Sequence, residues 1–163
     1  MRTATVSTRV APFAFATVVT AKAIENLLEN TGEGGYRDSH PWIVAKELLA
    51  EAKSRDEIVP LLLAVPDESN ELSLSHWAPI VEIEALELHR GQWDSICRFG
   101  ALKEVNPIWQ SLDSVALSPT AEQLRREHKE QLQVHRYHLD ATVIRPYAIC
   151  ETPPFLLYGD AAS

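Results

Sequence analysis

The sequence contains few of the residues that build disulfide or metal frameworks. Its 163 residues include only two cysteines, Cys97 and Cys150. Two cysteines this far apart form neither a disulfide framework nor a zinc knuckle. Both lie in apolar, strand-like sequence, where a free cysteine usually behaves as a small buried hydrophobic residue. We therefore expect two reduced, buried thiols in a cytoplasmic protein.

The chain also lacks a long hydrophobic run. No stretch approaches the roughly 20 apolar residues of a membrane span, so we expect no association with a membrane. The N-terminus superficially resembles a signal peptide, because Arg2 and Arg9 precede an apolar segment and an Ala-Lys-Ala sequence at 21–23. However, Pro12 interrupts that segment, which is short and only mildly apolar. This again favours a cytoplasmic location.

An excess of positive charge is absent as well. The formal net charge is −8, which works against non-specific attraction to nucleic acid or to anionic membranes. Binding of a phosphate group would therefore require a local basic patch. With 45% hydrophobic and 23% charged residues, the composition is that of a globular protein, and the length predicts one domain spanning residues 1–163.

The first third of the sequence predicts a strand and two helices. Residues 13–20 alternate aromatic and small side chains, which indicates a strand, and residues 21–30 read as a short helix. Glycines in residues 31–38 indicate a loop. A second helix is expected to follow Ser39 as the N-cap and Pro41 in its first turn, and to end near residues 54–56. Its apolar stripe comprises Ile43, Val44, Leu48, Leu49 and Ala52.

Two apolar runs in the middle of the chain predict a long β pair. Residues 58–65 are apolar on both faces, residues 66–70 have turn chemistry, and residues 74–90 follow as a second strand. The apolar phase of that strand changes after Ala85, so we expect a β-bulge or bend there. The predicted fold is α+β, a small mixed sheet that is bent or closed into a pseudo-barrel, with about three flanking helices.

The last third predicts shorter elements. A short strand is expected around residues 96–99, and residues 108–117 are ambiguous between strand and loop. Capping residues at 118–120 open a third helix that is predicted to run to about His135. Residues 140–150 are β-like.

Catalytic and metal-binding signatures are not evident. His128 and His135 share a helix face, with His138 nearby, but two helical turns separate the first pair by about 10 Å, too far for one zinc ion. We therefore expect no metal and no cofactor. No Gly-x-Ser-x-Gly sequence is present, and the glycines at 32–35 lack the Gly-Lys-Ser/Thr end of a phosphate loop.

Aromatic and arginine side chains are the better candidates for binding. Trp77 and Trp109 are predicted to offer stacking surfaces for a base, and Tyr36 with Arg37 could cover a pocket. Arg145 interrupts an apolar run, where an unpaired charge is costly, so it is predicted to bind an anionic group. A salt bridge to Glu82 or Glu84 is an equal alternative for Arg145.

The order of elements resembles the PUA-like superfamily, in particular its ASCH and EVE branches. The resemblance covers residues 55–150 and rests on Arg-Asp-Glu-Ile-Val-Pro-Leu-Leu-Leu-Ala at 55–64 and His-Trp-Ala-Pro-Ile-Val-Glu-Ile-Glu-Ala-Leu at 76–86. It implies a pocket for a nucleobase, often in RNA or DNA. The Gly-x-Lys-x-x-Glu motif of ASCH domains is absent, so the resemblance assigns no site residue.

Two other functions remain open. Residues 25–71 contain 11 acidic and 4 basic residues, which is compatible with a small acidic protein that binds and regulates a basic protein partner. A metal-dependent hydrolase built on the histidines is the third possibility. The leading hypothesis is a non-catalytic binding module with an aromatic pocket for a nucleobase or nucleic-acid-derived ligand.

Overall fold

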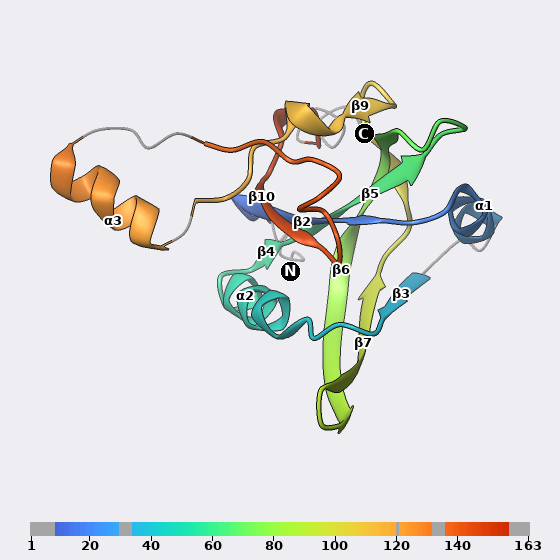
Figure 1. Cartoon of the computed structure of the whole chain (residues 1–163), viewed down its shortest axis with the longest axis horizontal. Coiled ribbons are helices and arrows are strands. Elements are labelled where there is room, and N and C mark those ends of the chain that lie inside the picture. The colour runs from blue at the N-terminus through green and yellow to red at the C-terminus, as the bar shows by residue number, and fades with distance from the viewer. Residues whose placement is uncertain (1–8, 30–33, 120, 132–135, 157–163) are drawn as a thin grey trace, which may run out of the picture.

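The computed structural model describes residues 9–29, 34–119, 121–131 and 136–156. These residues form the predicted α+β fold, in which helices surround a mixed sheet (Figure 1). The strand order of the larger sheet is β10-β2-β5-β6-β7-β3, and the short strands β8 (Lys103–Glu104) and β9 (Gln110–Ser111) also pair with β6. A smaller parallel pair joins β1 (Arg9–Val10) to β4 (Glu57–Ile58).

The predicted central β pair is confirmed. Strand β5 (Pro60–Pro66) is buried along almost its whole length and runs antiparallel to β6 (Leu72–His89), with Leu62 opposite Trp77. On its other side β5 pairs in parallel with β2 (Phe13–Val18), which is the predicted first strand. A strand covered on both faces needs apolar residues at every position, which explains the continuous run in β5.

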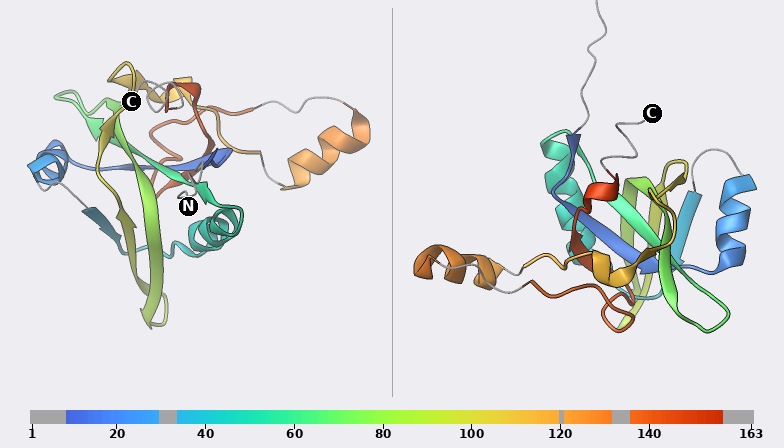
Figure 2. Two further views of the ribbon diagram at one scale, coloured as in Figure 1. Left: turned by 180° about the vertical axis from the view of Figure 1, so that it is seen from behind. Right: turned by 90° about the horizontal axis from the view of Figure 1, so that it is seen from above.

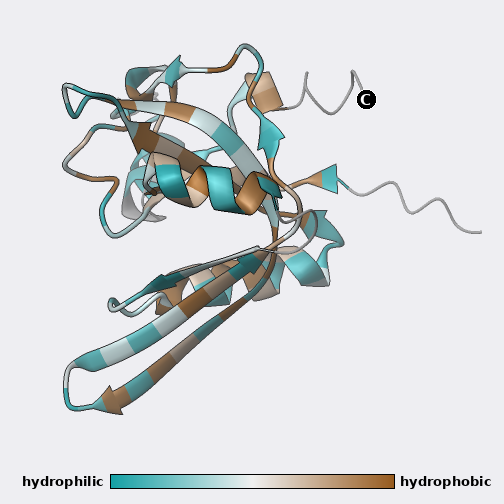
Figure 3. Cartoon of the chain, turned by 90° about the vertical axis from the view of Figure 1, so that its right-hand side faces the viewer, coloured by the Kyte–Doolittle hydropathy of each residue, from teal (hydrophilic) through white to brown (hydrophobic). Residues whose placement is uncertain are grey.

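Strand β6 belongs to two parts of the sheet. Its first half pairs with β5, and its second half pairs with β7 (Gln92–Phe99) to form a hairpin that extends away from the rest of the fold (Figure 1). Figure 3 shows how hydrophobic and hydrophilic residues alternate along this hairpin. The bulge predicted near Ala85 lies elsewhere: the register shifts between Ile80 and Glu82, and again between Glu87 and His89. The extra residue at the first shift, Val81, is 40% exposed, so Ile80 and Ile83 can both face the core.

Three α-helices and a short 3₁₀ helix, η1 (Leu112–Ser114), accompany the described strands. Helix α1 (Ala21–Glu29) and helix α2 (Ile43–Ser54) lie at different ends of the fold and both contribute buried residues to the same hydrophobic cluster, while α3 (Ala121–Glu130) projects away from the body of the fold (Figures 1 and 2). No helix among the described residues is both long and apolar enough to cross a membrane.

Helix α2 begins later than the sequence predicted. Trp42, and not Ser39, occupies its N-cap position, and no side chain caps the helix there. Ala45, Leu49 and Ala52 form its buried face, while Ile43 and Val44 of the predicted apolar stripe are exposed. The predicted end near residues 54–56 is confirmed.

Two further predictions about local structure were wrong. Part of the predicted loop at 31–38 is strand β3 (Gly34–Asp38), which pairs antiparallel with β7. The predicted strand at 140–150 is shortened to β10 (Ala148–Glu151). Residues 140–145 instead form turns, because the carboxylate of Asp140 accepts hydrogen bonds from the backbone N–H groups of Thr142 and Val143, at 2.8 and 2.9 Å.

Two hydrophobic clusters lie on opposite faces of the central strands. Phe15 and Leu61 belong to the cluster that also contains Trp42, whereas Ala14 and Leu62 belong to the cluster that contains Trp77. This division follows from the alternation of side chains along a strand. One cysteine lies in each cluster, Cys97 in the first and Cys150 in the second, and both are free and buried as predicted.

Candidate ligand-binding site

A hollow beside α1 brings together two of the residues that the sequence singled out. Its volume is about 380 Å³, and we call it the Tyr36–Arg145 hollow. Its walls come from the end of β2, the start of α1, β3, the end of β5 and the loop before β10. The lining residues are Val18, Val19, Thr20, Ala23, Tyr36, Pro66 and Arg145. Most of the wall is therefore apolar, with one aromatic ring and one cation.

The ring of Tyr36 is supported from behind by other aromatic rings. Along β3 the residues Gly34, Tyr36 and Asp38 are partly buried, while Gly35 and Arg37 are exposed. The Tyr36 ring centroid lies 5.8 Å from that of Trp42, which is only 1% exposed. Trp42 in turn packs on Tyr147, with 4.3 Å between their centroids. Tyr36 is thus fixed against a buried aromatic stack.

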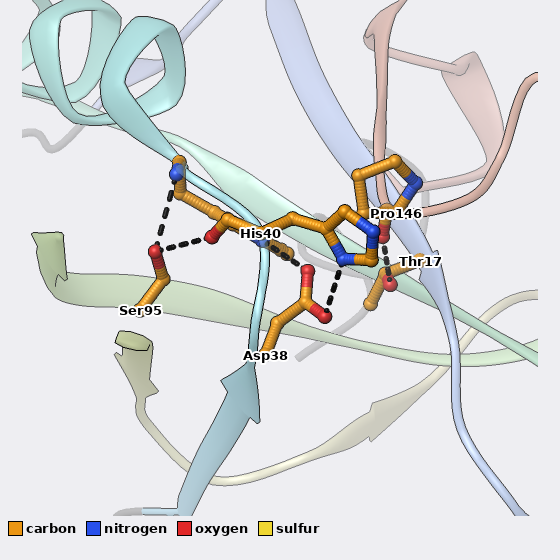
Figure 4. Close-up of polar contacts among 6 residues, drawn as sticks. Thr17, Asp38, His40, Ser95 and Pro146 are labelled. Atoms are coloured by element: carbon orange, nitrogen blue, oxygen red, sulfur yellow. Dashed lines mark hydrogen bonds and ion pairs between the residues drawn. The ribbon is translucent and has the colours of Figure 1, made fainter. Parts of the chain in front are cut away.

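Polar contacts hold Trp42 in this position, and Figure 4 shows the side chains of Asp38 and Ser95 that take part in them. Its indole N–H donates to Asp38 Oδ2 at 2.8 Å, and its backbone N–H donates to Ser95 Oγ at 3.2 Å. Asp38 Oδ1 also contacts His40 Nδ1 at 3.0 Å. The indole N–H and the backbone N–H of the buried Trp42 therefore both have hydrogen-bond partners.

These residues do not form a catalytic triad, although they include a serine, a histidine and an aspartate. The hydroxyl of Ser95 donates to the backbone carbonyl of His40 at 2.6 Å and not to its imidazole (Figure 4). Ser95 is also only 2% exposed. A nucleophilic serine needs its hydroxyl on the base and open to substrate, so this group serves to position Trp42.

Arg145 lies at the edge of the hollow on the loop that precedes β10. It follows the turn at Asp140, so the apolar run that it interrupts is not a strand, and its side chain is exposed. Its guanidinium donates a long hydrogen bond, 3.4 Å, to the carbonyl of Ala141. The neighbouring Pro146 carbonyl accepts a hydrogen bond of 2.7 Å from Thr17 Oγ1, which attaches this loop to β2 (Figure 4).

The alternative salt bridge of Arg145 is not formed. Glu82 and Glu84 both bind Arg98, at 2.8 and 3.0 Å. Within the described part of the chain, no carboxylate lies within ion-pair distance of Arg145. Its positive charge therefore remains available at the hollow.

The other three predicted site residues lie elsewhere. Arg37 is on the opposite face of β3, where it forms a bidentate ion pair with Asp94 at 2.9 and 3.0 Å. Trp77 is 2% exposed and belongs to the second hydrophobic cluster, with the Lys103 ammonium 5.1 Å from its ring centroid. Trp109 is 57% exposed and lines a separate hollow of about 420 Å³.

Sequence reasoning did not assign roles to Trp42 and Tyr147, which support Tyr36. A local signal existed for both. Trp42 stands immediately before a helix whose apolar stripe was recognised, and Tyr147 is two residues from Arg145. The contact between them joins parts of the chain that are far apart, so their pairing could not be read from local sequence.

Histidine and cysteine side chains do not gather into a metal-binding group in the described part of the chain. Among the described residues, no group of three or more His, Cys, Asp or Glu side chains could hold a metal ion. His128 and His138 are exposed, and His135 lies outside the described residues. Burial raises the pKa of the thiols of Cys97 and Cys150 to about 12 in each case, which keeps them protonated and unreactive at neutral pH.

Comparison with protein-family models, with curated proteins and with solved structures found no match.

Proposed function

We propose that this domain is a non-catalytic binding module for a nucleobase or a nucleic-acid-derived ligand. The observation that supports the proposal is that Tyr36 and Arg145 line the same hollow. In this arrangement the base stacks on Tyr36 and an anionic group of the ligand, such as a phosphate, binds Arg145.

The size of the Tyr36–Arg145 hollow suits a ligand of this kind. Small-molecule sites have volumes of about 300–1,000 Å³ and are mostly apolar, with a few placed polar groups. At about 380 Å³ the hollow lies near the lower end of that range, which favours a single base or nucleotide over a longer segment.

Rigid support of the aromatic ring strengthens the stacking argument. An aromatic side chain that is already held in one position loses little conformational entropy when a base stacks on it. Tyr36 satisfies this condition, because buried Trp42 lies behind it and Tyr147 lies behind Trp42. Stacking on an aromatic ring tolerates different bases, since every base has a π-face.

The charge of Arg145 supplies the second element of recognition. A guanidinium presents several donors in a plane and can bind a phosphate or carboxylate through two hydrogen bonds. In a protein of net charge −8, a cation without a carboxylate partner among the described residues concentrates positive potential at this hollow. This single positive charge supports the binding of an anionic group, although it is smaller than the basic patch that the sequence called for.

Membership of the PUA-like superfamily remains part of this proposal. It rests on the order of the predicted elements over residues 55–150. The alternative of an acidic protein that regulates a basic partner has less support. The acidic residues of positions 25–71 that the structure describes are distributed over α1, β3, α2, β4 and the turns after α2 and β5, and the two helices lie at different ends of the molecule (Figures 1 and 2).

The proposal can be tested by calorimetric titration of the full chain with nucleoside monophosphates and with the corresponding nucleosides, at low and high salt. We expect the monophosphates to bind more tightly, with the difference reduced by salt and removed in Arg145→Ala. Arg37→Ala is the matched control, because Arg37 is an exposed arginine on the opposite face of β3. Failure of all these compounds to bind, or equal effects of the two arginine substitutions, would reject the proposal.

A further inference from the structure

A larger hollow is separate from the Tyr36–Arg145 hollow. Its volume is about 870 Å³, and it lies between residues 10–13, α2, residues 118–119 and β10. We call it the Phe13–Leu48 hollow. It shares no lining residue with the Tyr36–Arg145 hollow.

The walls of the Phe13–Leu48 hollow are mainly apolar. They include the side chains of Phe13, Leu48, Pro119 and Ile149, and Phe13 and Leu48 are both only partly buried. Phe13 packs against the fully buried Phe15, with 5.8 Å between the ring centroids, so one wall continues into the first hydrophobic cluster. A ligand here would remove apolar surface from water on several sides, which is the main source of affinity in such sites.

The charged groups of this hollow compensate one another. Arg136 Nε lies 3.0 Å from Glu151 Oε1, and Arg136 Nη1 lies 2.8 Å from Glu127 Oε1 on α3. Hydrogen bonds that Arg136 donates to Glu127 and, to a lesser extent, to Glu151 raise the pKa of its guanidinium, so the group stays charged and paired. Thr152, another polar lining residue, donates its hydroxyl to the carbonyl of Ala11 at 2.6 Å.

This charge arrangement determines which ligands fit. An anionic ligand that approaches Arg136 also approaches the carboxylates of Glu127 and Glu151, and a cationic ligand must compete with the guanidinium for them. A neutral ligand meets neither the repulsion from the carboxylates nor the competition with the guanidinium. We propose that the Phe13–Leu48 hollow binds a neutral small molecule with an extended apolar body, at a site independent of the proposed nucleotide site.

The test uses the fluorescence of Nile red, a neutral apolar dye, with the full chain. Bound dye is then displaced by octanol, nonanol and decanol, and by decanoate and decylammonium below their aggregation concentrations. We expect the alcohols to displace the dye, with affinity rising about fourfold for each added methylene group, because each buries one more CH₂. The two charged compounds are expected to displace it less well than decanol.

Two substitutions locate the site. Leu48→Glu should reduce dye and decanol affinity about tenfold or more, because it places an unpaired charge in the apolar wall. Ile43→Glu, an exposed position on the same helix that lines none of the hollows described above, should leave both unchanged. Leu48→Trp, which fills the hollow without adding charge, provides a second test if Leu48→Glu lowers the melting temperature.

Several results would overturn the inference. Among them are equal or tighter binding of decanoate or decylammonium, and unchanged dye affinity in both Leu48 variants. The inference would also be overturned if the alcohols do not bind and the chain instead forms a dimer that dissociates in Leu48→Glu. That result would mean that a second copy of the chain occupies the hollow. Nucleoside monophosphates should not displace the dye, so failure of this inference is distinguishable from failure of the proposed function.

Discussion

The indole N–H of Trp42 donates a 2.8 Å hydrogen bond to Oδ2 of Asp38, and this bond ties the start of α2 to the end of β3. The same contact fixes the ring against which Tyr36 packs. A single carboxylate therefore connects the stability of this part of the fold with the geometry of the Tyr36–Arg145 hollow.

Replacement of Asp38 by alanine should destabilise the protein by about 1–3 kcal/mol, because a buried indole N–H loses its acceptor. Urea denaturation measures the change. Asp94→Ala is the matched control on the neighbouring strand β7, since its partner Arg37 is largely exposed and such surface pairs contribute about 0–1 kcal/mol. Equal losses in the two variants would contradict the structural role assigned to Asp38.

Tyr36→Ala should lower the affinity for both nucleosides and nucleoside monophosphates, because each loses its stacking surface. Base–aromatic stacking contributes about 1–3 kcal/mol per base, equivalent to about 5- to 150-fold in the dissociation constant. Tyr36→Phe keeps the ring and should retain most of the affinity. Calorimetric titration distinguishes the variants, and a loss as large in Tyr36→Phe would indicate that the hydroxyl, and not the ring, contacts the ligand.

Gly34→Ala should destabilise the fold by about 1–3 kcal/mol through overpacking. A Cβ atom at this position would lie 2.5 Å from Leu27 Cδ2 and 2.7 Å from Phe99 Cε1, so the side chains of Leu27 and of the buried Phe99 would have to shift. Gly35→Ala is the control on the same strand, because its Cβ would meet only the Cys97 carbonyl oxygen, at 3.8 Å. Thermal melting of the two variants tests this expectation, which fails if they melt together.

Stability should fall with acidification through the titration of His76. Burial lowers the pKa of His76 below its usual 6.5, and the nearby charge of Glu104 opposes this only in part. At acidic pH the folded protein therefore binds fewer protons at His76 than the unfolded chain does. The free energy of unfolding is therefore highest above pH 6.5 and decreases as the pH falls below that value. Urea midpoints at about pH 7.5 and about pH 5.5 measure the loss across the range in which histidine titrates.

His76→Gln should reduce this pH dependence, whereas His138→Gln, at an exposed position, should preserve it. If the His76 variant loses as much stability on acidification as the parent protein, another group is responsible.

Both thiols should be inert in the native protein. Cys97 and Cys150 are at most 1% exposed, and burial raises the pKa of each thiol to about 12. A chromogenic disulfide reagent should therefore react with neither residue at neutral pH, and with both after denaturation in guanidinium. Rapid reaction of either thiol without denaturant would mean that its strand opens locally.

The central sheet could be predicted from the sequence because the residues that indicate its strands and its turn are neighbours in the chain. Continuous apolar residues at 60–65 require a strand buried on both faces, and the polar turn after Pro66 returns the chain antiparallel. The bulge was predicted in the correct strand but at the wrong residue. Its position depends on how Ile80 and Ile83 both reach the core, which is a property of the packed structure.

The structure of two other segments could not be predicted from their local sequence. Residues 34–38 have the composition of a loop and become a strand because β7 provides a partner and because Gly34 allows close approach to Leu27 and Phe99. Residues 141–147 have strand-like composition, but the carboxylate of Asp140 bonds to the following backbone and starts a turn. In both places a contact outweighs the intrinsic preference of the residues.

The sequence by itself determined the α+β class, the pairing of β5 with β6 and the burial of both cysteines. It also singled out five candidate binding residues, which are Tyr36, Arg37, Trp77, Trp109 and Arg145. Only the tertiary structure decided that Tyr36 and Arg145 share a hollow, that Trp77 lies in the core and that Arg37 binds Asp94 instead. The physical reason is that periodicity and turn chemistry act between neighbours in the chain. The placement of Tyr36 and Arg145 around one hollow depends instead on how β3 and the loop before β10 are held against the ends of β2 and β5.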